Sequence, residues 1–200
     1  MKDPTSHESY PDPHHDTYSN TVFGFWVYLL TDFMLFGALF ATYAVLKNNT
    51  FGGPPAKDLF HLPFVFIETL ILLLCSFFSG LGGASAHRKK KNRTIILFGL
   101  TFLAGVVFMV MEFHDFNRLI DSGNSWQRSG FLSAYFTLVG THSLHVILGL
   151  LWIIVILLPV FWSGLTPVNI KRLSCLRIFW QFLNVVWVFI FSIVYLMGVN

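Results

Sequence analysis

Five ionisable residues lie inside long apolar stretches of this sequence. They are the acids Asp32, Glu68 and Glu112 and the histidines His142 and His145. An ionisable group inside the hydrocarbon of a bilayer costs at least about 2.5 kcal/mol, so such a group is expected to be functional or tightly paired. The chemistry open to these residue types is proton relay, ligation of a metal or haem, and hydrogen bonding between helices.

The two histidines stand three residues apart in segment 140–146 (GTHSLHV), on one face of a helix. Three interpretations compete. Haem ligation fits poorly, because two histidines on one turn cannot take opposite axial positions on one iron. A metal pair would need carboxylates from neighbouring helices. Hydrogen bonding to Asp or Glu of an adjacent helix is the interpretation we favour. Gly149 continues the face of His142 and would let a partner helix approach.

The three acids differ in their expected depth. Asp32 lies near the middle of its apolar stretch. Glu68 lies about five residues into an apolar helix, and Glu112 lies about 17 residues past Ile95, or roughly 26 Å along a helix. The sequence therefore predicts that Asp32 must find an internal partner, whereas Glu68 and Glu112 are able to extend to the membrane interface.

The elements that position these residues are long apolar helices. Hydrophobic residues make up 54% of the chain and charged residues 12%, against roughly 25% charged in soluble domains. The mean hydropathy is +0.64. A membrane span needs about 20 apolar residues. We predict an all-α bundle with five transmembrane helices in a membrane domain over 22–200, its spans near 22–46, 61–86, 94–114, 131–160 and 175–198.

Residues 1–21 are polar and lack the basic start of a signal peptide. We expect them to form a disordered cytoplasmic tail before a retained membrane anchor. Nine of the 13 Lys and Arg residues lie on the side of the N-terminus and of the second and fourth loops. The positive-inside rule then predicts a cytoplasmic N-terminus and a periplasmic C-terminus. The basic run 88–93 is expected to meet anionic lipid headgroups rather than nucleic acid.

These residues resemble one family, subunit III of haem-copper terminal oxidases, in the five-helix form of the cytochrome o-type ubiquinol oxidases. The resemblance is specific because many short segments match in the right order and at the right spacing. The matching segments are 23–26 (FGFW), 28–32 (YLLTD), 40–43 (FATY), 52–54 (GGP), 62–65 (LPFV), 68–69 (ET), 112–113 (EF), 128–133 (RSGFLS), 140–142 (GTH), 145–146 (HV), 179–187 (FWQFLNVVW) and 194–198 (VYLMG).

The resemblance implies a multi-pass subunit of the bacterial inner membrane with no catalytic centre of its own. It would bind no haem, copper or other cofactor. Haem and copper would lie in the partner catalytic subunit I, beside which it packs with other oxidase subunits and membrane lipids. Asp32 occupies the place of the family's intramembrane carboxylate. The implied function is to stabilise the catalytic subunit and support proton uptake, in a respiratory complex that oxidises ubiquinol with dioxygen and translocates protons.

The chain departs from the family in its last span. Members usually have His and Asp where this sequence has Gln181 and Asn184. An amide keeps the capacity to hydrogen-bond but does not ionise in this range. We therefore predict that these two residues form a structural hydrogen-bond link between helices.

Two other classes of membrane protein also carry ionisable residues within their membrane spans. A small proton-coupled transporter or channel is the main alternative, because intramembrane acids and histidines also mark ion relays. The odd number of spans and the lack of an inverted repeat or of paired broken helices disfavour it. A b-type cytochrome would need histidines at mid-depth on two facing helices, which His142 and His145 do not supply.

Overall fold

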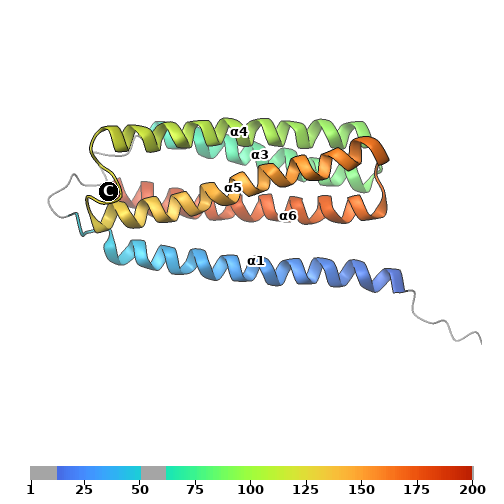
Figure 1. The fold of residues 1–200 in the computed structure, drawn as a ribbon, viewed down its shortest axis with the longest axis horizontal. Helices are drawn as coiled ribbons and strands as arrows, with labels where there is room; N and C mark the ends of the chain where they lie inside the picture. The colour runs from blue at the N-terminus through green and yellow to red at the C-terminus, as the bar shows by residue number, and fades with distance from the viewer. Residues whose placement is uncertain (1–12, 51–61, 200) are drawn as a thin grey trace, which may run out of the picture.

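The computed structural model describes the backbone of residues 13–50 and 62–199. Within these ranges the regular structure is all helical, without a strand, and five helices are long and apolar enough to cross a membrane, as predicted. The elements are α1 (Pro13–Leu46), α3 (Leu62–His87), α4 (Lys91–Asp121), α5 (Gly130–Ser163), α6 (Pro167–Ile190), the π-helical turn η1 (Phe191–Leu196) and α7 (Met197–Val199) (Figure 1).

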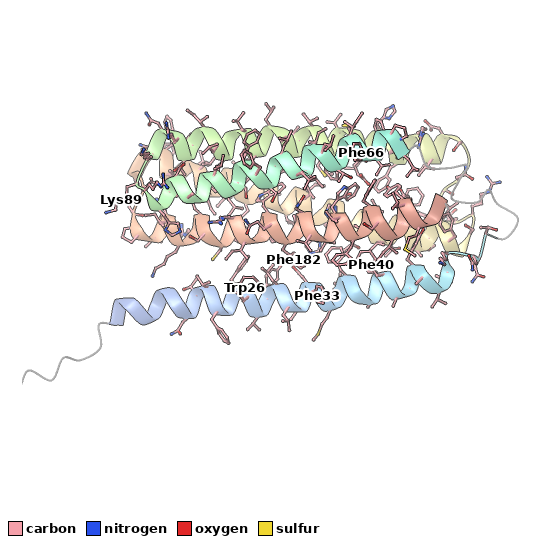
Figure 2. The ribbon with its side chains drawn as sticks, turned by 180° about the vertical axis from the view of Figure 1, so that it is seen from behind. Trp26, Phe33, Phe40, Phe66, Lys89 and Phe182 are labelled. Atoms are coloured by element: carbon pink, nitrogen blue, oxygen red, sulfur yellow. The ribbon has the colours of Figure 1, made fainter. Side chains whose placement is uncertain are left out.

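Helices α3, α4, α5 and α6 pack together as a bundle, and α1 lies along α5 and α6 (Figure 1). Figure 2 shows Phe40 and Phe182 at the interface between α1 and α6. Ring centroids at this interface lie 6.3 Å apart for Phe36 with Phe182 and for Phe40 with Phe189. Aromatic packing therefore contributes to the attachment of α1.

Local capping signals set the helix ends. Ser129 accepts a hydrogen bond from the backbone N–H of Leu132 at 3.2 Å, which caps the start of α5. Thr166 caps α6, and Pro167 occupies its first turn, where the missing N–H costs nothing. Between these two helices Gly164 adopts φ +74°, a left-handed conformation that glycine takes without strain.

These signals place some helix ends away from the predicted spans. Helix α6 begins at Pro167, well before the span predicted from residue 175, and α4 continues to Asp121, past the predicted end at residue 114. Helix α1 begins at Pro13, so residues 13–21, predicted as disordered tail, are helical, while residues 1–12 lie outside the described part. The first or last turn of a helix can consist of polar residues. A prediction from hydropathy does not detect such a turn.

Close approach in the core depends on Gly149, as predicted. A Cβ added there would lie 3.0 Å from Cε1 of Phe179 and 3.3 Å from Cζ2 of Trp180. Gly105 of α4 has the same role, since its added Cβ would lie 2.8 Å from Cδ2 of Leu150. Small residues let the backbones of α4, α5 and α6 approach closely, which is how helices associate in lipid.

The bundle has two chemically different ends. The α3–α4 and α5–α6 turns lie at one end, and the C-terminus and the α4–α5 turn lie at the other (Figure 1). We name the first the basic end, after the cations at the α3–α4 turn: Arg88, Lys89, Lys90, Lys91 and Arg93.

Candidate functional site

Asp32 and His145 form a buried pair between α1 and α5. Asp32 is 8% exposed and His145 is 9% exposed. Oδ2 of Asp32 lies 3.7 Å from Nε2 of His145, which is within ion-pair range but longer than a hydrogen bond. The structure thus places a histidine beside an acid of an adjacent helix, but Oδ2 of Asp32 lacks the hydrogen bond that was expected for it among the described residues.

The other ring nitrogen of His145 limits the proton arrangement of the pair. Nδ1 lies 2.8 Å from the carbonyl oxygen of Thr141, one turn back, and must therefore donate a hydrogen to it. A neutral imidazole in that tautomer points a lone pair from Nε2 toward Asp32. A carboxylate oxygen would then face a lone pair, so this tautomer forms no hydrogen bond between the two side chains, in agreement with their 3.7 Å separation.

Aromatic side chains lie beside the Asp32–His145 pair. Phe36 is 1% exposed, and its ring centroid lies 5.3 Å from that of His145. Tyr28, one turn before Asp32, lies close enough to interact with it through its hydroxyl group. The pair is thus held by α1 and α5 together, and its polar atoms are largely enclosed by protein.

His142 does not pair with an acid, contrary to the interpretation we favoured from the sequence. It is 0% exposed, and its Nε2 donates to the carbonyl oxygen of Leu183 on α6 at 3.2 Å. Its ring centroid lies 5.0 Å from that of Trp187 and 6.0 Å from that of Phe108. Nδ1 has no partner among the described residues. His142 therefore joins α5 to α6 beside α4.

Trp187 extends this contact to α3. Its indole N–H donates to Oγ1 of Thr69 at 3.1 Å, and its ring meets that of Phe108 edge-to-face at 4.8 Å. The hydrogen bond between Trp187 and Thr69 could not be predicted from the sequence, because the two residues stand 118 positions apart in the chain.

Glu68 and Glu112 are buried inside the bundle, so their side chains do not extend to its surface as the sequence would have allowed. They are 0% and 1% exposed. None of their carboxyl oxygens has a hydrogen-bond partner among the described residues. Glu112 interacts electrostatically with Glu68 and with Asp115, which is itself bound to Arg118 at 3.0 Å.

Tyrosine side chains from α5 and η1 lie near the two acids. Tyr135 of α5 and Tyr195 of η1 both interact electrostatically with Glu112. Their hydroxyl oxygens lie 2.9 Å apart and share a hydrogen bond. This tyrosine pair was not predicted from the sequence, because Tyr135 and Tyr195 stand 60 positions apart in the chain.

Gln181 and Asn184 do not form the predicted hydrogen-bond link with any residue in 20–50 or 62–198. Nε2 of Gln181 lies 4.0 Å from the position of a Cβ added at Gly80 of α3. Oδ1 of Asn184 is buried without a hydrogen-bond partner.

No group of three or more His, Cys, Asp or Glu side chains gathers closely enough to hold a metal ion in the part of the chain that the structure describes. Nε2 of His142 and Nδ1 of His145 already bind backbone carbonyl groups. The histidines are thus arranged for contacts within the protein.

Comparison with known proteins gives consistent matches over nearly the whole chain. The family model described as cytochrome c oxidase subunit III matches residues 2–199. Cytochrome bo(3) ubiquinol oxidase subunit 3 of Pseudomonas aeruginosa is 51% identical over 94% of this chain and 90% of its own length. Cytochrome c oxidase subunit 3 of Bacillus sp. strain PS3 is 42% identical over 90% and 86%. Quinol oxidase subunit 3 of Bacillus subtilis is 39% identical over 90% and 88%.

Proposed function

Since this chain belongs to the cytochrome c oxidase subunit III family, we propose that it is the non-redox accessory subunit III of a proton-translocating quinol:dioxygen oxidoreductase. It is a multi-pass protein of the bacterial inner membrane. Relatives named as subunits of ubiquinol or quinol oxidases support quinol as the electron donor of the complex. They also favour this function over that of a transporter or channel.

The observation that carries the finer proposal is the Asp32–His145 pair. It brings α1 and α5 together, with Oδ2 of Asp32 3.7 Å from Nε2 of His145. The pair therefore links α1 to the rest of the bundle and places an ionisable carboxyl group between two helices, where Asp32 is 8% exposed. We propose that the chain stabilises the catalytic subunit and supports its proton uptake through this pair.

The haem and copper of such a complex would lie in the catalytic subunit. The residues of this chain contribute contacts between helices, as His142 does to Leu183. The basic end would face the cytoplasm, since cations in loops are retained on that side. The N-terminus would then be cytoplasmic and the C-terminus periplasmic.

The test uses the complex purified with Asp32→Ala, Asp32→Asn or His145→Gln. We expect normal haem content in each variant, because the pair touches no redox centre. In the Ala variant, sustained turnover or subunit retention should fall at least about threefold, since the unpaired imidazole stays buried. Haem absorbance, the decay of oxygen consumption over many turnovers and subunit stoichiometry are the measurements.

Asp121→Asn is the matched control, because it removes an exposed carboxylate from the same chain. Undiminished turnover and retention in Asp32→Ala would refute the role of the pair. Transport by the isolated chain would instead revive the channel interpretation. We expect liposomes that contain this chain alone to show no proton flux above protein-free vesicles.

A further inference from the structure

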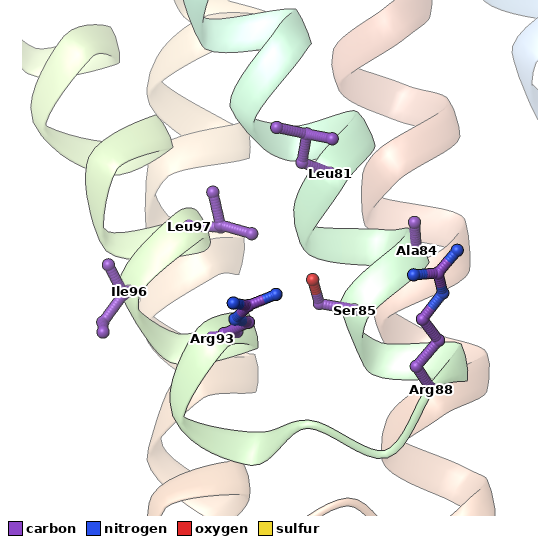
Figure 3. Close-up of a pocket in the computed structure, with 7 residues that line it drawn as sticks. All are labelled: Leu81, Ala84, Ser85, Arg88, Arg93, Ile96 and Leu97. Carbon is purple, nitrogen blue, oxygen red and sulfur yellow. The ribbon is translucent and has the colours of Figure 1, made fainter.

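A groove opens at the basic end between the last turns of α3 and the first turns of α4 (Figure 3). It has a volume of about 440 Å³. It is remote from the Asp32–His145 pair, which lies between α1 and α5. Its lining combines apolar Leu81, Ala84, Ile96 and Leu97 with polar Ser85, Arg88 and Arg93.

The polar and apolar parts of this groove are separated along the helix axis. Figure 3 shows Arg88 and Arg93 near the α3–α4 turn, and Leu81 and Leu97 farther from it, toward the middle of the bundle. Arg88 directly follows α3, and Arg93 stands in the first turn of α4. In a chain that spans the membrane, this arrangement places the arginines at the surface and the leucines beside hydrocarbon.

The charge of the two arginines is not neutralised by this chain. Neither forms an ion pair within the described residues. The sequence contains no Asp or Glu in 69–111 or in 122–200, which together supply both turns of the basic end. An anion that enters the groove therefore meets two guanidinium groups and no carboxylate from the surrounding turns.

Lys91, in the same turn, is already engaged. Its ammonium group donates to the carbonyl oxygen of Phe161 at 2.7 Å and lies 5.9 Å from the centroid of the Phe161 ring. Beside it a second groove of about 470 Å³ runs between α4 and α5, and its lining from Ile95, Gly99 and Ile153 to Trp162 carries no charged side chain. The first groove thus differs from the second because cationic side chains lie beside its apolar lining.

We propose that the α3–α4 groove binds an anionic glycerophospholipid of the bilayer. Its phosphodiester would lie between Arg88 and Arg93, because guanidinium groups bind phosphate oxygens in a bidentate manner. The hydroxyl group of Ser85 is a further donor at the same level. One acyl chain would cover Leu81 and Leu97. A free phosphate ion would leave that apolar half of the groove unused.

Native mass spectrometry of the intact complex, titrated with phosphatidylglycerol or phosphatidylcholine, tests this proposal. We compare the wild type with the double variant Arg88→Gln/Arg93→Gln. The control is Lys89→Gln/Lys90→Gln, which removes two charges from the same turn but outside the groove. We expect the arginine variant to bind one phosphatidylglycerol at least about tenfold more weakly. The lysine variant should retain it, and phosphatidylcholine binding should not change.

Three results would overturn the proposal. They are equal loss in both double variants, no loss in the arginine variant, and displacement of the phosphatidylglycerol by millimolar inorganic phosphate. If the arginine variant does not assemble, Ala84→Trp fills the apolar part and leaves the charges in place. It should lose the same lipid, whereas Gly99→Trp, in the second groove, should keep it. Full retention in Ala84→Trp would contradict an acyl chain in the groove.

Discussion

Two arrangements bury ionisable side chains in this bundle. Asp32 and His145 face each other between α1 and α5, with Oδ2 and Nε2 3.7 Å apart. Glu68 and Glu112 are enclosed near one another, and neither lies in ion-pair range of a cation among the described residues. Two carboxylates so placed would repel each other in a medium of low dielectric constant, so at least one of them should carry a proton.

Glu112→Gln tests that inference, because the amide keeps the size of the acid and removes its negative charge. We expect the free energy that holds subunit III in the complex to change by no more than about 1 kcal/mol in this variant. Glu112→Ala should cost about 2 kcal/mol or more, because it leaves a cavity. Thermal release of the subunit measures both effects, and infrared difference spectra should lose a protonated carboxyl band in Glu112→Gln. Equal destabilisation by Gln and Ala would show that the charge itself is required.

His142 is a buried histidine whose contacts hold neighbouring helices together. Because its ring lies between Trp187 and Phe108 and its Nε2 binds the carbonyl group of Leu183, His142→Ala should loosen the bundle by about 2 kcal/mol or more. The haem and copper spectra of the assembled complex should not change. Thr137→Ala, at an exposed site on the same helix, is the control. Loss of a metal signal with normal assembly would contradict a packing role.

The position of a residue along its helix could be counted from the sequence, whereas most side-chain partners could not be predicted. Counting along an apolar stretch places Asp32 near mid-membrane and Glu68 off-centre. It does not say which neighbour covers the side chain, because that depends on the rotation of each helix. The tyrosine pair near Glu112 consists of Tyr135 and Tyr195, which stand 60 positions apart in the chain. The hydrogen-bond link expected for Gln181 and Asn184 failed for the same reason.

At the scale of the elements, hydropathy found all five membrane helices, because each is far longer than the minimum that spans a bilayer. It did not reveal η1, where the helix widens to π geometry at Phe191–Leu196. This turn brings Tyr195 to Tyr135, and the carbonyl group of Val194 accepts from the hydroxyl group of Tyr43 at 3.4 Å. Such widening depends on tertiary contacts and has no local sequence signature here.

Helix contacts at Gly149 provide a prediction at this scale. A Cβ atom added to Gly149 would lie 3.0 Å from the Phe179 ring. A Cβ atom added to Gly140, on the same helix, would meet nothing within 4 Å. We expect Gly149→Ala to destabilise the assembled subunit by about 1–3 kcal/mol, because the rings must shift. Gly140→Ala should be neutral or slightly stabilising. Thermal dissociation measures both, and equal effects would exclude close approach as the cause.

Most of the Lys and Arg residues in the described part of the chain lie at the basic end of the bundle, and the orientation proposed from this asymmetry can be measured. Cys75 and Cys175 are buried, so a membrane-impermeant maleimide should leave them unlabelled. Gln127→Cys, in the exposed α4–α5 turn, should react in intact spheroplasts, because that turn would face the periplasm. Asn92→Cys, exposed at the basic end, should react only after permeabilisation or in inside-out vesicles. The reverse labelling pattern would place the basic end in the periplasm. The arginines of the α3–α4 groove would then meet the outer leaflet, and Asp32 would have to serve proton movement from the opposite side.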